Sequence, residues 1–292
     1  MSGCMLCPRK CGARRDENEI GMCHVGADIF ISRAAPHHFE EPPISGTRGS
    51  GTVFFAGCSL GCVFCQNKEI SRDAVGKCVS EEELGEICLS LAATGVHNLN
   101  LVTGTHYTDR IARVLQRIKP QLKIPVVWNS SGYERPETLR LLEGLVDIYL
   151  PDFKYFSPTL AKACSNAQDY KEVAVAALRE MYRQVGAVRY DENGMLRCGT
   201  VVRHLVLPGC REDTVAVLET LAKTLPVSNI LLSLMRQYTP DFSPQTAPKH
   251  LQRRVTTFEY EKALLKAQEL GFTGFTQGKD AASAAFTPDF HT

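Results

Sequence analysis

Residues 52–65 read TVFFAGCSLGCVFC and join a short apolar segment to three closely spaced cysteines. The first five residues are apolar or β-branched, as in a buried strand, and Gly57 lets the chain turn directly after it. Cys58, Cys62 and Cys65 follow, with three and then two residues between them. This order predicts three thiols at the carboxyl end of a strand, where α/β barrels place their chemistry.

Downstream of this loop, segments typical of strands and helices alternate at least six times. Ser80 with Glu83 forms a capping box that begins a helix, and the predicted strands are short and almost wholly apolar, as in parallel sheets. A closed eight-fold barrel needs about two more units. We therefore expect an α/β fold, a partial (β/α)6 TIM-like barrel of parallel strands. The predicted strands are 52–57, 97–102, 124–128, 146–150, 203–209, 228–235 and 272–276; the predicted helices begin after Ser80 and cover 107–118, 134–144, 168–186, 211–225 and 258–270.

The N-terminal fifty residues differ from the rest in composition. They are rich in Cys, Gly, Pro and Arg and show no sustained hydrophobic period, and residues 40–46, EEPPISG, have the composition of a turn-rich connector. We expect two units: residues 1–50 as an irregular Cys-rich metal-binding segment and connector, and residues 51–292 as the barrel.

The overall composition excludes several classes of protein. The 33 basic and 32 acidic residues give a formal charge of +1 and form no long block of one sign, so no nucleic-acid or membrane partner is expected. The N-terminus has no apolar signal core, which favours a cytoplasmic protein. In a reducing compartment, twelve cysteines with seven in two tight groups indicate metal ligands rather than disulfides.

The spacing C-x3-C-x2-C suits an iron–sulfur cluster. Three thiolates on a loop of eight residues can hold one corner of a [4Fe–4S] cubane, with Gly57 and Gly61 allowing close approach of the backbone. The fourth iron then lacks a protein ligand and stays open to a cofactor or substrate. The alternatives are a zinc knuckle, which needs a fourth Cys or His nearby, or a set of buried thiols.

The motif C-x3-C-x-aromatic-C, with Phe64 as the aromatic residue, resembles the signature of the radical S-adenosylmethionine (SAM) superfamily. The following residues, Gln66-Asn67-x-x-Ile70-Ser71, resemble the branch of putative pyruvate formate-lyase activating enzymes. The resemblance extends from about Cys4 to Gln277. It implies a partial barrel in which the open iron of Cys58, Cys62 and Cys65 chelates SAM, and one electron splits SAM into methionine and a 5′-deoxyadenosyl radical that abstracts hydrogen.

The resemblance also assigns SAM contacts to the loop after the second predicted barrel strand. Relatives carry Gly-Gly-Glu there, and this chain has Thr103, Gly104 and Thr105 instead. Gly104 permits close approach and Thr105 offers a hydroxyl, so we expect all three residues to contact SAM. The alternative is an ordinary turn with Thr105 as a helix N-cap.

Three further loops supply polar candidates for the SAM pocket. Asn129 follows the third strand of the barrel and can accept from the SAM ammonium group, unless it serves only a turn. Asp152 and Lys154 resemble the Asp-x-Lys element of glycyl-radical activases, and two residues apart on a strand they point the same way; the alternative is an exposed ion pair. Arg203 could neutralise a carboxylate, although strand alternation does not decide between Arg203 and His204.

The N-terminal group, Cys4, Cys7, Cys11 and Cys23, contains four thiols, which form a closed set of metal ligands. Zinc and a second iron–sulfur cluster both fit the spacing, and a disulfide pair is the alternative. We expect a metal, because so short and irregular a segment needs a staple to be ordered.

For function, the resemblance implies an activase whose radical abstracts hydrogen from a glycine of a glycyl-radical enzyme, with a reductant such as flavodoxin or ferredoxin. Two alternatives remain: radical SAM modification of another peptide or small molecule, and a catalytically inactive zinc-binding scaffold. We expect no catalytic residue beyond the cluster and SAM themselves.

Overall fold

The computed structural model describes residues 3–278 and contains one mixed sheet, whose order within that range is β10-β9-β8-β6-β5-β4-β2-β1-β3, with β7 paired to β8. The strands are β1 (Ile29–His37), β2 (Ser50–Phe55), β3 (Lys77–Val79), β4 (Leu99–Val102), β5 (Val126–Ser130), β6 (Ile148–Pro151), β7 (Arg189–Tyr190), β8 (Leu196–Leu205), β9 (Leu231–Met235) and β10 (Gly274–Thr276).

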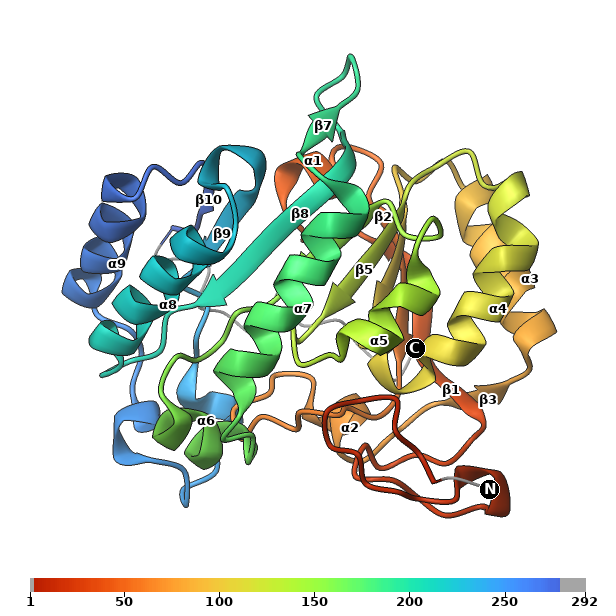
Figure 1. The fold of residues 1–292 in the computed structure, drawn as a ribbon, viewed down its shortest axis with the longest axis horizontal. Coiled ribbons are helices and arrows are strands. Elements are labelled where there is room, and N and C mark those ends of the chain that lie inside the picture. The colour runs from red at the N-terminus through yellow and green to blue at the C-terminus, as the bar shows by residue number, and fades with distance from the viewer. Residues whose placement is uncertain (1–2, 279–292) are drawn as a thin grey trace.

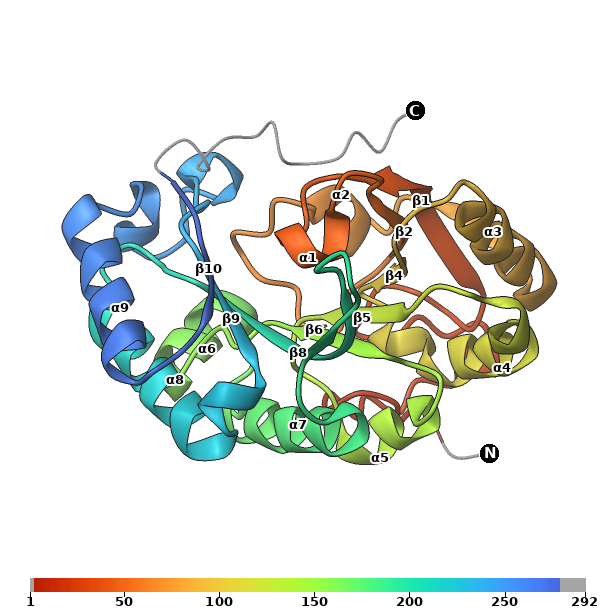
Figure 2. The same ribbon diagram turned by 90° about the horizontal axis from the view of Figure 1, so that it is seen from above.

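Along this order, each pairing between β10 and β2 is parallel. The sheet curves, and its two edges, β10 and β3, do not pair with one another, so the barrel stays open (Figure 2). The predicted α/β class and partial barrel are confirmed. All carboxyl ends of the parallel strands therefore meet at one end of the molecule.

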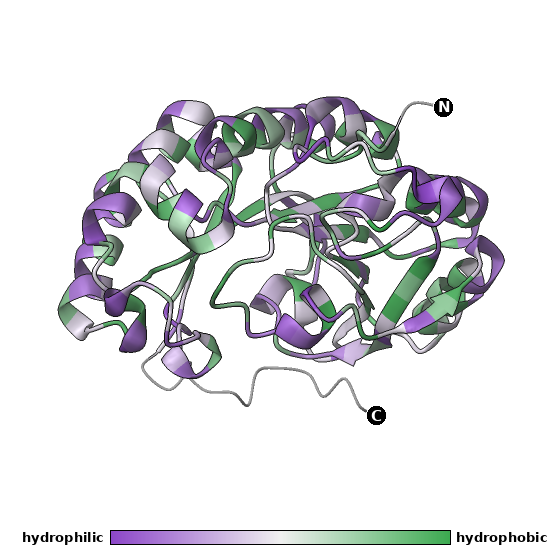
Figure 3. Ribbon diagram, turned by 90° about the horizontal axis from the view of Figure 1, so that it is seen from below, coloured by the Kyte–Doolittle hydropathy of each residue, from purple (hydrophilic) through white to green (hydrophobic). Residues whose placement is uncertain are grey.

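The longer helices lie outside this curved sheet (Figures 1 and 2). The predicted capping box is present: the Glu83 amide donates to Ser80 Oγ at 3.1 Å, and the Ser80 amide donates to Glu83 Oε2 at 2.7 Å. The outward-facing parts of the helices are mostly hydrophilic, and the strands between the helices are mostly hydrophobic (Figure 3). The helices are α1 (Pro42–Ser45), α2 (Lys68–Ser71), α3 (Glu81–Ala93), α4 (Thr108–Ile118), α5 (Pro136–Leu139), α6 (Pro158–Ser165), α7 (Tyr170–Val185), α8 (Arg211–Thr224) and α9 (Thr257–Glu269).

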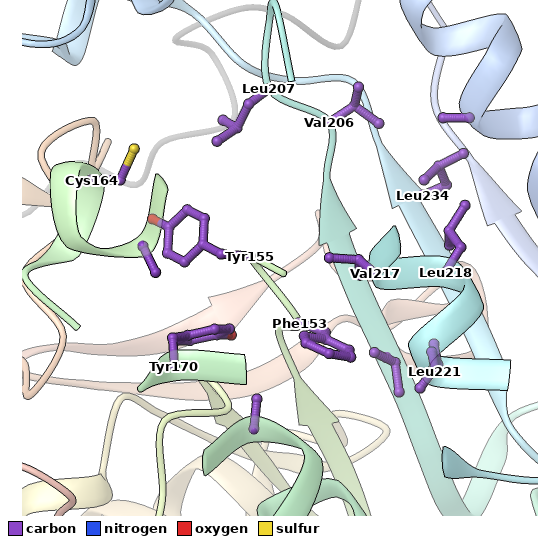
Figure 4. Packing of buried hydrophobic residues seen from close by; sticks show 14 of the residues in the cluster. Phe153, Tyr155, Cys164, Tyr170, Val206, Leu207, Val217, Leu218, Leu221 and Leu234 are labelled. Carbon is purple, nitrogen blue, oxygen red and sulfur yellow. The ribbon is translucent and has the colours of Figure 1, made fainter. Parts of the chain in front are cut away.

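Aromatic side chains pack beneath the carboxyl end of β6. Tyr155 meets Tyr170 edge-on at 5.1 Å between ring centroids, and Phe153 lies 6.5 Å from Tyr170. Figure 4 shows these rings near Val217, Leu218 and Leu221 of α8 and near Val206 and Leu207, which follow β8. This packing holds the segment after β6 rigidly, which matters because that segment carries polar residues of the site.

The connector at residues 40–46 has an unexpected position. Its short helix α1 lies at the opposite end of the strands from α2 (Figure 1). Ile44 is fully buried in a cluster with Val127, Ile148 and Val201, which belong to β5, β6 and β8. The connector therefore closes the barrel at the amino ends of its strands and forms the floor of the barrel interior.

Several predicted boundaries are wrong. Residues 29–37, which the sequence placed in the irregular segment, form β1, which pairs antiparallel with β2 and β3; residues 3–28 contain only one short 3-10 turn. The strand and turn predicted at 203–209 lie too far along the chain, because β8 begins at Leu196 and ends at Leu205. The predicted helix 134–144 is shortened to α5 and a following 3-10 turn.

None of the helices in the described part of the chain, residues 3–278, combines the length and apolar character that a membrane span requires.

Candidate functional site

A cavity of about 510 Å³ opens within the barrel at the carboxyl ends of the strands. Its walls come from the cysteine loop, from the carboxyl ends of the other parallel strands with the loops that follow them, and from the connector below. The cysteines and other polar residues that line it include Cys58, Cys62, Cys65, Asn67, Thr103, Asn129, Ser130, Asp152, Lys154, Arg203, Glu40 and Glu41.

The three cysteines of the loop share one wall of this cavity. Cys62 is buried, and its sulfur accepts from the Ser165 hydroxyl at 3.1 Å. The sulfur of Cys58 accepts from the Leu60 amide at 3.4 Å, and that of Cys65 accepts from the Ser71 hydroxyl at 3.4 Å. Each thiol is thus held in place by a donor.

Burial raises the pKa of the Cys58 thiol to about 12, and the neighbouring Cys62 adds to this effect. Burial likewise raises the pKa of Cys65. Buried thiols such as those of Cys58 and Cys65 resist ionising in a site of low dielectric unless positive charge is added nearby. Iron binding supplies that charge and releases the protons.

As the side chains stand within residues 3–278, no three or more His, Cys, Asp or Glu are grouped closely enough to hold a metal ion. The loop thiols are spread along a cavity wall instead. A cubane cluster binds its thiolates at separate corners, so this spread is compatible with the predicted [4Fe–4S] cluster, and the donor set of three thiols fits it.

Opposite charges gather beside the thiols, at the ends of β6 and β8. Lys154 Nζ lies 2.7 Å from Asp152 Oδ2, and Arg203 Nε lies 3.2 Å from Asp152 Oδ1. Asp152 and Arg203 are side by side because they form a parallel bridge between their strands. Although burial opposes it, Lys154 and Arg203 hold the pKa of Asp152 below its usual value. The structure thus brings together Asp152, Lys154 and Arg203, whereas His204 turns away to Phe153 O and Thr214.

The cavity floor carries two acids that the sequence did not reveal as site residues, Glu40 and Glu41. Glu40 lies 3.3 Å from Arg203 and accepts from the amides of Asn100 at 3.0 Å and Asn129 at 3.2 Å. Burial raises the pKa of Glu40 and of Glu41. No local pattern signals their role, because only the fold carries the connector under the cavity.

The residues of the loop after β4 have two different environments. Thr103 lines the cavity in a left-handed conformation, with φ +61°, whereas Gly104 and Thr105 are not among the lining residues. A Cβ on Gly104 would lie 2.8 Å from the Trp128 ring, so this glycine makes room for packing. The Thr105 hydroxyl donates to Glu134 Oε1 at 3.0 Å. The sequence predicted that Gly104 and Thr105 contact SAM, but neither residue lines the cavity.

The N-terminal cysteines lie outside this cavity, in a segment packed against the cysteine loop (Figure 1). The Cys58 amide donates to the Cys23 carbonyl at 3.1 Å, which joins the two groups. None of the twelve cysteines, all of them within residues 3–278, is in a disulfide.

The cavity also suits a zwitterionic cofactor such as SAM. Its wall offers cations and carboxylates side by side, and two buried oxygens on it, Asn67 Oδ1 and Glu41 Oε2, have no hydrogen-bond partner among residues 3–278. Orphaned acceptors of this kind are costly unless a ligand donates to them.

Comparisons with known proteins agree with this geometry. The family model of the radical SAM superfamily matches residues 52–209. An uncharacterized protein of Methanocaldococcus jannaschii is 30% identical over 277 residues, which cover 91% of this chain and 74% of that relative.

Among solved structures, a radical SAM methyltransferase from Sphaerobacter thermophilus has a TM-score of 0.51 at 16% identity and covers 80% of this chain and 69% of its own. Streptococcus suis SuiB bound to the precursor peptide SuiA has a TM-score of 0.51 at 12% identity, over 78% of this chain and 48% of its own. At these identities the likeness is one of fold. Because the family match begins at β2 and spans the cysteine loop and the charged ends of β6 and β8, this chain belongs to the radical SAM superfamily.

Proposed function

We propose that this radical SAM enzyme is an activase, which abstracts hydrogen from a glycine of a glycyl-radical enzyme. The main support for this proposal is that three thiols and three charged side chains line one cavity. The thiols are those of Cys58, Cys62 and Cys65, and the charged residues are Asp152, Lys154 and Arg203. The branch-specific residues Gln66, Asn67, Ile70 and Ser71 all line the same cavity.

When the cluster and SAM are bound, one-electron reduction splits SAM into methionine and a 5′-deoxyadenosyl radical that abstracts hydrogen. The residues of the chain hold the cofactor. Lys154 and Arg203 provide positive charge for the SAM carboxylate, while Asp152 and Glu40 provide negative charge for its ammonium group. Asn129 fixes the direction of the Arg203 guanidinium, whose Nη2 donates to Asn129 Oδ1.

The open side of the barrel supports a polypeptide substrate. The cavity is lined by His37 and Phe39 near β1 and also by Phe275 and Gln277 near β10, the two sides of the unclosed sheet. The Phe39 side chain is exposed, with 60% of its surface accessible. A loop bearing a glycine can reach the cavity from this side, and a reductant such as flavodoxin or ferredoxin supplies the electron.

The test is to incubate the anaerobic, iron- and sulfide-reconstituted protein with SAM, reductant and a candidate glycyl-radical enzyme. The expected result is 5′-deoxyadenosine together with the paramagnetic doublet of a glycyl radical in the partner. The Cys62→Ala variant is the matched negative control, because the partner and reductant stay the same.

Two other outcomes would contradict the activase proposal. Formation of 5′-deoxyadenosine without a glycyl radical in any candidate would favour modification of another peptide or a small molecule. Zinc at both cysteine groups with no 5′-deoxyadenosine would favour a catalytically inactive scaffold.

A further inference from the structure

The four N-terminal thiols stand apart from the SAM cavity, and the proposed reaction leaves them unused. Residues 3–28 have no strand or α-helix, yet they are ordered around Cys7 and Cys23, both buried, and Cys4 and Cys11. Pairs of backbone bonds fold this segment back on itself: the Cys4 amide donates to Ala13 O at 2.9 Å, and the Gly12 amide donates to Cys4 O at 3.1 Å. So small an irregular unit lacks the apolar core that would order it alone.

The N-terminal thiols repeat a local geometry of the cluster loop. In the cluster loop, a tight backbone turn follows Cys62, because the Cys65 amide donates to Cys62 O at 3.2 Å. In the N-terminal segment, a turn of the same kind follows Cys7, because the Lys10 amide donates to Cys7 O at 3.1 Å. Both segments therefore place two cysteines of a group on either side of a tight turn, at Cys62–Cys65 and at Cys7–Cys11.

The sulfurs of Cys11 and Cys23 flank Gly21. A Cβ at Gly21 would lie 3.5 Å from Cys11 Sγ and 3.3 Å from Cys23 Sγ. Arg15 Nη1 approaches the sulfur of Cys4 at 3.9 Å and adds positive charge to the group. The turns around Cys7–Cys11 and around Gly21–Cys23 are separated in the sequence but lie close together in space.

The segment also grips the cluster loop. Arg9 donates to Ser59 O at 2.8 Å and to Leu60 O at 3.1 Å, both inside the loop, and also to Ser165 O at 2.7 Å. The Cys23 carbonyl accepts from the Cys58 amide at 3.1 Å. The backbone on both sides of Cys58 is therefore held by residues that lie next to N-terminal cysteines.

We propose that Cys4, Cys7, Cys11 and Cys23 bind a second metal centre, and that this centre clamps the loop carrying Cys58, Cys62 and Cys65. The shared chemistry is a set of four thiolates, which both a zinc ion and an iron–sulfur cluster accept. The centre has a structural role toward the loop that carries Cys58, Cys62 and Cys65. It fixes the positions of Arg9 and the Cys23 carbonyl, and these two groups hold the loop through hydrogen bonds.

The metal is tested in a protein that cannot load the first site. The variant Cys58→Ala/Cys62→Ala/Cys65→Ala is prepared without oxygen and supplied with zinc in one arm and with iron and sulfide in the other. We expect either about one zinc per chain or about four irons with matching sulfide per chain. Adding Cys7→Ala and Cys11→Ala abolishes this binding, and adding Cys78→Ser, at an exposed thiol outside both groups, does not.

Zinc and iron outcomes both support the centre and tell its two forms apart. Neither metal above the level of the protein that also lacks Cys7 and Cys11, with the circular dichroism of a folded chain, would overturn it.

The clamp is tested by hydrogen exchange. Loss of the second metal, by Cys7→Ala/Cys11→Ala or by chelation of the variant that lacks Cys58, Cys62 and Cys65, should speed amide exchange in residues 57–62 about tenfold. Exchange in β5, two places away from β2 in the sheet order, should stay unchanged. Unchanged exchange in residues 57–62 after metal loss would overturn the clamp, and the chelation arm decides this even when Cys7→Ala/Cys11→Ala folds poorly.

Discussion

Two buried carboxylates near the ends of neighbouring strands have opposite surroundings. Glu134 accepts from Trp128 Nε1 at 2.8 Å, Thr105 Oγ1 at 3.0 Å and Ser130 Oγ at 2.5 Å, all neutral donors. Asp152 is held between the cations Lys154 and Arg203 and lines the cavity. Glu134 is almost wholly buried and the Asp152 side chain is 13% exposed, and of the two only Asp152 lines the cavity.

The difference shows what marks a binding residue in this barrel. A carboxylate whose acceptors are all used by neutral neighbours stabilises the fold and has nothing left for a ligand. A carboxylate shared between two cations, in the same cavity as Glu41 Oε2, which has no hydrogen-bond partner within residues 3–278, can exchange its contacts for those of a charged cofactor. Substitutions of Asp152 and Glu134 therefore separate these two roles.

The largest effect is expected from Asp152→Asn. The change keeps the shape but removes the charge that compensates Lys154 and Arg203, so we expect the rate of 5′-deoxyadenosine formation at limiting SAM to fall about 100-fold. The measurement is product formation per reconstituted cluster. The matched control is Asp109→Asn, which removes a half-exposed partner of Arg113 and should leave the rate unchanged. An equal rate in both variants would contradict a cofactor-binding role for Asp152.

Glu134→Ala should act on stability instead. It leaves three buried donors without an acceptor, which should lower the free energy of unfolding by about 3 kcal/mol. Urea denaturation measures this loss, with Glu137→Ala, at an exposed partner of Arg135, as a control expected to change it by less than about 0.5 kcal/mol. A loss no larger than in the control would mean that the network around Glu134 is not structural.

The two carboxylates should also give stability opposite dependences on pH. Because the pKa of Asp152 is held low, its contribution is present above its ordinary pKa, about 4, and is lost as the pH falls through the lower folded value. Burial raises the pKa of Glu134, so the folded state binds that proton more tightly and stability falls as the pH rises above about 4. Asp152→Asn should flatten the loss at acid pH, and Glu134→Gln should flatten the decline toward neutral pH. Unfolding curves at several pH values that show the reverse assignment would refute this.

The smallest effect is expected from Thr105→Val. It removes one donor from the Glu134 network at nearly constant volume, which should lower the free energy of unfolding by about 1 kcal/mol. The KM for SAM should stay the same, because Thr105 is not on the cavity wall. A raised KM with unchanged stability would instead support the SAM contact that the sequence suggested.

The sequence predicted the parallel strands and the cysteine loop because those signals are local. An apolar run such as residues 52–56, a capping box at Ser80 and the spacing of three cysteines each depend on a few adjacent residues. Asp152 and Lys154 could be found for the same reason, since two residues apart on a strand they share a face.

The remaining features depend on contacts between distant segments. Glu40 and Glu41 looked like part of a connector, because only Ile44 packing inside the barrel places them under the cavity. Thr105 looked available because its partner Glu134 is twenty-nine residues away in the chain. β1 lacked a period because its burial is irregular after Ile31.

The proposed chemistry depends on three thiols that leave one iron of a cluster open to SAM. The measurement that tests this dependence compares unaltered protein with Cys62→Ala, both reconstituted without oxygen and reduced in the presence of SAM, and quantifies 5′-deoxyadenosine by chromatography. We expect steady production by the unaltered protein and none above background by Cys62→Ala. Production by Cys62→Ala at the unaltered rate would show that the cluster does not need this thiol.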